Sequence, residues 1–251
     1  MINLNKFAVF ILTHGRADNV VTKKTLDRCG YTGKIYYIVD NEDKQIGKYI
    51  ENFGKENVKI FDKKAMADNI DEYNNFDNRS VIIHARNACF EIAKDLGLDY
   101  FVQFDDDYYY FGYRGEQGAV ICNNLDIVFK SFIEFLEKTN VKSIAFSQGG
   151  DHIGGFSGVR LKRKAMNSFI CSTKNDFKFI GSINEDVNTY TTLASRGDLF
   201  FTFTGFQLDQ KDTQSQNNGM TTEYLLTGTY VKSFHSVLSM PSSVKVSMMN
   251  S

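Results

Sequence analysis

Short apolar runs alternate with amphipathic segments along the first half of the chain. Four runs are apolar on both faces and lie at residues 7–12, 34–39, 58–61 and 100–104. Such runs predict buried strands, and helical periodicity in the stretches between them predicts helices. Strands that alternate with helices indicate a mostly parallel sheet flanked by helices, so we assign this half to the α/β class.

The expected helices have recognisable ends. One covers residues 19–28 and stops before Gly30, and a short one follows through Tyr49. Residues 62–78 are polar and predict a loop. Ser80 is a candidate N-cap for the next helix, which Gly97 closes. Its expected apolar stripe consists of Ile82, Ala85, Cys89, Ala93 and Leu96.

The second half has a less regular pattern. It predicts a helix at 125–136, a strand at 141–146, another strand near 198–203 and a helix around 221–226. A glycine-rich loop at residues 149–155 precedes a basic cluster. With only one proline in the chain and no repeat or linker, nothing in the pattern divides it into separate domains.

Composition narrows the class of protein. The chain of 251 residues carries 22 Phe and 13 Tyr, which is incompatible with a disordered, solvated polymer. Its formal net charge of −1 excludes a bulk polycation, so contact with a polyanion would need a local basic patch.

The four cysteines are scattered singly among apolar neighbours. This placement favours buried free thiols over a disulfide framework or a zinc site. No apolar run approaches the ~18–20 residues of a membrane span, and the polar start of the chain lacks the marks of a signal peptide. We expect a soluble cytoplasmic protein with no obligate protein partner.

Three consecutive carboxylates follow the strand at 100–104. In open α/β sheets, ligands bind beyond the carboxyl ends of strands. Asp105 and Asp107 point to one side and Asp106 to the other, and two carboxylates so close repel each other unless a cation lies between them. Oxygen ligands suit Mg²⁺ or Mn²⁺, although a solvated acidic turn is an equally good reading of the triplet alone.

Arg86 lies at the border of the apolar stripe on the preceding helix. A guanidinium there needs an anionic partner, because an unpaired buried charge is costly. A structural aspartate or a bound diphosphate would each satisfy it.

Together these motifs resemble a known family. Arg86-Asn87, the apolar strand and Phe104-Asp105-Asp106-Asp107 are similar to the core signature of GT-A glycosyltransferases over about residues 7–200. The opening at residues 10–19 and the stretches at 25–36 and 38–43 more narrowly resemble the TET-associated glycosyltransferases. That family is found largely in phages and is thought to glycosylate hydroxymethylated pyrimidines in DNA.

The resemblance implies a GT-A-like domain over residues 1–251. Residues 1–107 would be the half that binds the nucleotide sugar, and residues 108–251 the acceptor half. The implied donor is a nucleoside diphosphate sugar, expected to be UDP-linked. Thr13, His14, Gly15 and Arg16 would line the nucleotide pocket, with Asp40 on the base or ribose. Arg86 would face the diphosphate, Asp107 with Asp105 would hold the metal, and Asp106 would lie nearer the ribose.

Glu185-Asp186 resembles the acidic pair that opens a helix in many GT-A enzymes. By this resemblance Asp186 is the expected catalytic base, with Glu185 as neighbour or substitute. Taken alone, the pair is better explained as ordinary helix N-terminal acids, which capping and the helix dipole favour. His235 is a candidate third metal ligand, although a lone histidine is more often an ordinary hydrogen-bonded residue.

The acceptor side centres on the glycine-rich loop and the basic cluster. Asp151 and His152 are candidates for acceptor contact, and Arg160, Lys162, Arg163 and Lys164 could hold DNA phosphates. From spacing alone an ordinary exposed basic face is favoured, and it is the resemblance that implies a DNA contact. A base in a duplex would have to be flipped or presented single-stranded. Residues 108–111 are aromatic and could stack on it, or could belong to the core.

We therefore expect an inverting, metal-dependent glycosyltransferase that acts on hydroxymethylated DNA, in the host cytoplasm if phage-encoded. Three other functions are compatible with the motifs: the same fold acting on a glycan, lipid or protein, a binding module without turnover, and a metal-dependent nuclease or phosphohydrolase. The nuclease is disfavoured because it would need further acidic ligands in recognisable motifs.

Overall fold

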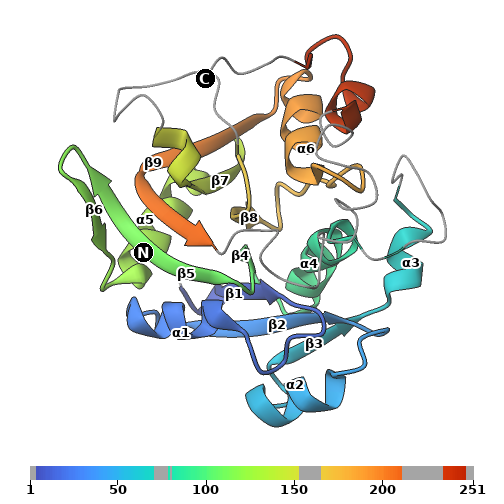
Figure 1. The fold of residues 1–251 in the computed structure, drawn as a ribbon, viewed down its shortest axis with the longest axis vertical. Coiled ribbons are helices and arrows are strands. Elements are labelled where there is room, and N and C mark those ends of the chain that lie inside the picture. Colours follow the sequence, from blue (N-terminus) through green and yellow to red (C-terminus); the bar gives the residue numbers. More distant parts are fainter. Residues whose placement is uncertain (1–3, 71–78, 80, 153–164, 211–233, 247–251) are drawn as a thin grey trace.

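The computed structural model describes residues 4–70, 79, 81–152, 165–210 and 234–246. Its described strands form a mixed sheet that runs through the whole fold (Figure 1). From edge to edge the order is β3 (Val58–Phe61), β2 (Lys34–Asp40), β1 (Phe7–Leu12), β4 (Tyr100–Asp105), β8 (Phe169–Ser172), β7 (Val141–Ser147), β9 (Leu199–Gln210), β5 (Tyr108–Gly115) and β6 (Gly118–Ile121).

The first four strands in this order are mutually parallel, as the sequence pattern predicts. Beyond β4, the short strand β8 pairs antiparallel with both β4 and β7, and β9 then runs parallel to β7. The fold class is therefore α/β with a parallel core, as expected. The helices are α1 (Val21–Arg28), α2 (Ile46–Phe53), α3 (Lys63–Ala67), α4 (Ile83–Asp95), α5 (Leu125–Lys138) and α6 (Glu185–Ala194), with 3-10 turns η1 (Leu4–Lys6) and η2 (Gly149–His152).

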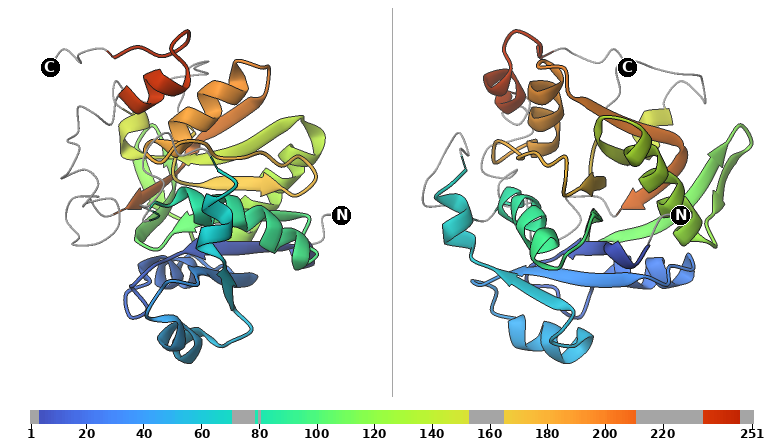
Figure 2. Two further views of the ribbon diagram at one scale, coloured as in Figure 1. Left: turned by 90° about the vertical axis from the view of Figure 1, so that its right-hand side faces the viewer. Right: turned by 180° about the vertical axis from the view of Figure 1, so that it is seen from behind.

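Two hydrophobic cores lie on opposite faces of the sheet, because alternate side chains of a strand point to opposite sides. Phe7, Val9 and Ile11 of β1 pack into the core that α1, α2 and α5 cover. Ala8, Phe10 and Leu12 instead join the core beneath α4. Figure 2 shows these layers from two further directions.

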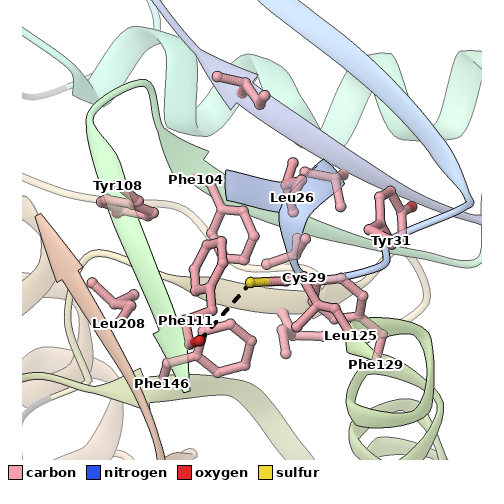
Figure 3. Close-up of a cluster of buried hydrophobic side chains, with 14 of the residues drawn as sticks. Leu26, Cys29, Tyr31, Phe104, Tyr108, Phe111, Leu125, Phe129, Phe146 and Leu208 are labelled. Atoms are coloured by element: carbon pink, nitrogen blue, oxygen red, sulfur yellow. Dashed lines mark hydrogen bonds between the residues drawn. The ribbon is translucent and has the colours of Figure 1, made fainter. Parts of the chain in front are cut away.

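The first core is rich in aromatic rings (Figure 3). Phe104 of β4 packs on Phe111 of β5 with ring centroids 5.2 Å apart, and Cys29 Sγ donates a hydrogen bond to the Phe111 carbonyl. All four cysteines are buried and free, as predicted. Within the aromatic run at residues 108–111, Tyr108 and Phe111 belong to the core and Tyr109 is exposed. Packing of strand β5 therefore explains much of this run.

Helix α4 differs from the expected amphipathic stripe. Ile82 is its N-cap residue, and its buried positions include Arg86 and Asn87. The helix is covered on both sides, because the segment after β8 packs against it: Asn87 exchanges two hydrogen bonds with the backbone of Phe179. Ser80, the expected cap, lies outside the described residues.

Helix α3 and the three strands β5, β6 and β8 were not expected. Helix α3 lies within the predicted loop at 62–78 and is capped by Asp62, whose side chain accepts a hydrogen bond from Ala65 N at 2.9 Å. The hairpin of β5 and β6 and the short strand β8 were also missed. The helix expected around 221–226 lies outside the described residues. Within the described residues, no helix combines the length and apolar character that a membrane span needs.

Candidate active site

The sheet brings three polar segments to one edge. Strands β1, β2 and β4 are adjacent and parallel, so their carboxyl ends meet there. Residues 13–16 follow β1, residues 40–43 close β2, and residues 105–107 close β4. This is the edge at which ligands bind in open α/β sheets.

The loop after β1 is fixed to the middle carboxylate of the triplet. Thr13 Oγ1 donates to Asp106 Oδ2 at 2.7 Å, and an Arg16 guanidinium nitrogen donates to Asp106 Oδ1 at 2.8 Å. Burial raises the pKa of Asp106 above its ordinary range, although Arg16 and Thr13 favour the carboxylate. Both oxygens of Asp106 are therefore used inside the protein. Asp106 thus ties the loop after β1 to the end of β4. The position near a ribose that the resemblance implies for Asp106 stays a prediction.

Tyr49 of α2 also contacts the loop after β1. The sequence analysis did not identify it as a site residue. Its hydroxyl lies 2.9 Å from Thr13 Oγ1 and accepts a hydrogen bond from Arg16 N at 2.8 Å. Gln45 adds a two-point contact, because it accepts from Ala17 N and donates to the Gly15 carbonyl, each at 3.0 Å. The loop is thus held in place before any ligand binds.

His14 and Asp40 meet, as the sequence assignment of both to one pocket predicts. His14 Nδ1 lies 2.6 Å from Asp40 Oδ2, and Lys63 Nζ lies 3.5 Å from the same oxygen. The hydrogen bond to Asp40 raises the pKa of His14 above its ordinary value. Burial alone would raise the pKa of Asp40, but His14 and Lys63 outweigh it and the pKa is lowered. Gly15, at φ 66°, donates its N–H to Asp43 at 2.7 Å and completes the turn.

Arg86 is held between two carboxylates. Its Nε donates to Glu185 Oε1 at 2.9 Å, and a terminal nitrogen donates to Asp105 Oδ1 at 3.3 Å. Burial opposes the charge, yet these carboxylates outweigh it and raise the pKa of Arg86. The side chain of Arg86 is only 2% exposed, and its Nη1 is buried with no hydrogen-bond partner among the described residues. The expected contact with a diphosphate stays a prediction. The structure supports the alternative of a structural carboxylate partner, and Arg86 joins the end of β4 to the start of α6.

Asp107 carries the clearest sign of a cation site. Burial, with Asp105 and Asp106 nearby, raises the pKa of Asp107 to about 7, and burial raises that of Asp105 to about 6. Asp107 Oδ1 is buried and has no hydrogen-bond partner among the described residues. A carboxylate in this state is suited to a divalent cation, which would satisfy the oxygen and favour the ionised form.

The predicted trio of Asp105, Asp107 and His235 is not assembled. Within the described residues, no three His, Cys, Asp or Glu side chains are grouped to hold a metal. His235 is buried in the helical segment 234–239. A site of one or two carboxylates still fits Mg²⁺, which is commonly bound by these together with substrate phosphates.

Glu185 and Asp186 begin helix α6, as the sequence predicts, and both are buried. Asp186 Oδ1 accepts a hydrogen bond from Val187 N at 2.7 Å. The preceding residue, Asn184, adopts the left-handed conformation, with φ 56° and ψ 38°. Glu185 is engaged by Arg86, which leaves Asp186 as the better candidate for proton transfer.

The acceptor-side residues are described only in part. In η2, Asp151 accepts a hydrogen bond from Gln148 N at 3.0 Å, and His152 Nε2 lies 3.0 Å from Ser147 Oγ. Burial raises the pKa of Tyr190 on α6, and Asp186 and Asp151 both add to the shift, so Asp151 lies in the surroundings of the candidate base. The four basic residues at 160 and 162–164 lie outside the described residues.

Three supporting residues escaped the sequence analysis: Tyr49, Lys63 and Asn184. Tyr49 occupies an apolar helix position, and Lys63 belongs to a polar stretch that predicts a loop. Only the left-handed preference of asparagine offers a signal for Asn184, and it is weak without knowledge of where the helix begins.

Solved structures share the fold. S. aureus TarS residues 1–349, crystallised with UDP-GlcNAc, is 14% identical, with a TM-score of 0.52 over 94% of this chain and 67% of that chain. Glucosyl-3-phosphoglycerate synthase from Mycobacterium tuberculosis, in complex with Mn²⁺, UDP and glucosyl-3-phosphoglycerate, is 9% identical, with a TM-score of 0.50 over 96% and 81%. In a further S. aureus TarS structure, this chain spans only 36% of the length of its relative.

At such identities these likenesses concern the fold alone, and they confirm the expected GT-A architecture. No curated protein sequence matches the chain. Residues 7–219, however, match the family model described as TET-Associated Glycosyltransferase. Because this match covers most of the sequence, it confirms both the resemblance and the enzyme class: the chain belongs to the TET-associated glycosyltransferase family.

Proposed function

We propose that the protein transfers a sugar from a UDP-linked donor to the hydroxyl of a hydroxymethylated pyrimidine in DNA. The observation that carries the proposal is the ion-pair chain Asp105–Arg86–Glu185. It joins the strand end suited to a nucleotide diphosphate to the helix that carries the candidate base. Family membership supports the DNA acceptor, and the donor class is supported by neighbours crystallised with UDP or UDP-GlcNAc.

The donor would bind over residues 1–107. The loop of Thr13 to Arg16, held by Asp106 and Tyr49, would enclose the nucleotide, and Asp40 would contact the base or ribose. Asp107, with Asp105 beside it, would hold a Mn²⁺ or Mg²⁺ ion. Such an ion acts as a Lewis acid that neutralises charge on the leaving diphosphate.

The acceptor half would comprise residues 108–251, with Asp186 as the catalytic base. The Asp186 carboxylate takes the proton of the hydroxymethyl group as its oxygen attacks the anomeric carbon. The bond between that carbon and the diphosphate oxygen breaks, and UDP leaves with the electron pair. One displacement inverts the anomeric carbon. Asp151 and His152 would flank the acceptor, while Arg160, Lys162, Arg163 and Lys164 would hold DNA phosphates around a flipped or single-stranded base.

The fold alone does not select DNA as acceptor. The M. tuberculosis neighbour, with its TM-score of 0.50, was crystallised with glucosyl-3-phosphoglycerate, a small product. The test must therefore separate DNA from other acceptors and also separate turnover from binding.

Nucleoside mass spectrometry provides this test. The protein is incubated with Mn²⁺, UDP-sugars and duplexes that contain cytosine, hydroxymethylcytosine or hydroxymethyluracil, and the DNA is digested to nucleosides. We expect a sugar-sized mass gain on one hydroxymethylated base, lost in Asp107→Asn and Asp186→Asn but kept in Asp95→Asn, which alters an exposed acid on α4. UDP release without any gain on DNA would overturn the acceptor assignment, and UDP-sugar binding without turnover would overturn the enzyme.

A further inference from the structure

The turn that presents the candidate base has an unusual backbone. Asn184 lies in the left-handed region, at φ 56° and ψ 38°, directly before Glu185 and Asp186. Side chains other than glycine rarely adopt this conformation, and asparagine is among the few that tolerate it. Such residues persist where the surrounding structure holds them, and they are frequent at active sites. The question is what holds this one.

A hydrogen bond from a distant part of the chain reaches this turn. Asn184 Nδ2 donates to Ser236 Oγ at 3.3 Å, across 52 positions of sequence. Ser236 is 4% exposed and belongs to the helical segment 234–239. That segment, drawn in red, lies beside α6 in Figures 1 and 2.

The other end of the turn is fixed locally. Asn188 Nδ2 donates to the Ile183 carbonyl at 2.9 Å, and Thr189 Oγ1 donates to the Glu185 carbonyl. These bonds lie within the turn and first helical turn of α6, so they tie the segment to itself. Arg86 fixes Glu185 to the sheet. The contact with Ser236 secures the side of the turn that faces the 234–239 segment.

We propose that Ser236 is a positioning residue for Asp186. Through Asn184 it holds the left-handed turn, and the turn fixes the direction in which α6 presents the Asp186 carboxylate. Catalytic groups must be held within a fraction of an ångström of the productive geometry, and their supporting hydrogen bonds provide this precision. The inference rests on the proposed role of Asp186, and it gives the 234–239 segment a task other than metal binding through His235.

Neighbouring residues supply a matched control. Ser239 lies in the same helical segment, but its hydroxyl donates to the His235 carbonyl of its own helix at 3.2 Å. Ser239→Ala therefore removes a serine hydroxyl from this segment without touching the turn. Asn184→Gly removes the hydrogen bond but keeps a residue at ease with positive φ, which separates loss of the bond from backbone strain.

The experiment compares kinetics and amide exchange in Ser236→Ala, Asn184→Gly, the double variant and Ser239→Ala. We expect kcat for sugar transfer to fall about tenfold in the first two variants, with KM for the donor unchanged because the donor residues lie on β1, β2 and β4. The double variant falls by less than the product of the two single effects, because both changes remove the Asn184–Ser236 bond. Ser236→Thr, which keeps the hydroxyl, restores most of kcat.

Hydrogen–deuterium exchange over residues 183–190 gives a readout that does not depend on the acceptor. Faster exchange in Ser236→Ala than in Ser239→Ala is expected. An inactive wild-type protein that still shows this difference refutes the proposed function and leaves the contact with the turn standing. Equal exchange in the two variants, or wild-type kcat in Ser236→Ala, refutes the positioning role. A parallel loss of kcat and donor affinity that follows the melting temperature also refutes it.

Discussion

Replacing Arg86 by methionine tests the ion-pair chain that joins the two halves of the site. The guanidinium is buried and donates to Glu185 at 2.9 Å and to Asp105 at 3.3 Å. It also lies over the rings of Phe169 and Phe179, 5.4 and 5.7 Å from their centroids. Methionine preserves much of the apolar contact but leaves two carboxylates without their cation.

The stability that Arg86→Met is expected to lose follows from the burial of the ion pairs. Removing one partner of a buried ion pair destabilises a protein by about 3–5 kcal/mol, because the remaining charge has lost its compensation. For a chain of this size, that corresponds to a fall in Tm of about 6–20 °C. The protein should still fold, since typical stabilities are about 5–15 kcal/mol.

The destabilisation caused by Arg86→Met should also depend on pH. The pKa of Asp105 is already about 6 with Arg86 present, and loss of the guanidinium raises it further. A carboxyl whose pKa is raised on folding contributes stability below its unfolded pKa, near 4, and loses it as pH rises through the folded value. The deficit of Arg86→Met is therefore larger at pH 8 than at pH 5.

Urea denaturation at both pH values provides the measurement, with Arg79→Met as control. Arg79 pairs with Glu42 at 2.8 Å, but both side chains are substantially exposed, so its loss should cost about 1 kcal/mol or less. A cost for Arg86→Met that equals the control, or that does not grow between pH 5 and pH 8, would refute the assignment of Arg86 as a buried link.

Three further predictions concern the donor side. His14→Gln should destabilise the protein more at pH 5.5 than at pH 9. Asp40 raises the pKa of His14, so the stabilising charge pair is present at low pH and is lost as the pH rises above the pKa of His14 in the folded protein. Denaturant titrations at the two pH values check this. Tyr49→Phe should weaken UDP binding several-fold, measured by calorimetry, because Arg16 N loses its acceptor. Chelation with EDTA should weaken UDP binding, and Mn²⁺ or Mg²⁺ but not K⁺ should restore it.

Sequence reasoning reached those parts of the fold that have a strong local pattern. The runs at 7–12 and 58–61 are strands with the expected bounds. The first is buried along its whole length, whereas the second is an edge strand that buries only Val58 and Phe61. Strand β8 escaped because four residues carry too little periodicity. Its place between β4 and β7 is decided by pairing with strands distant in sequence.

In the candidate site, too, the sequence predicted features set by local pattern and missed those set by contacts between distant residues. The positions of Asp40 and of the Asp105–Asp107 triplet follow from where strands end, so the sequence could place them together. The sequence left the partner of Arg86 open, because Glu185 lies 99 residues away along the chain and only the tertiary fold brings the two side chains together. The resemblance implied a place near the ribose for Asp106, but no local pattern indicates that Thr13 and Arg16 donate hydrogen bonds to it, because the loop after β1 reaches Asp106 only through the pairing of β1 with β4.

The most direct test of the central claim counts UDP released against hydroxymethylated bases consumed. With a duplex that carries a known number of hydroxymethylated pyrimidines, the account predicts one UDP for each base glycosylated, no release with the unmodified duplex, and loss of release in Asp186→Asn with UDP binding retained. UDP release at the same rate with or without hydroxymethylated DNA would contradict it.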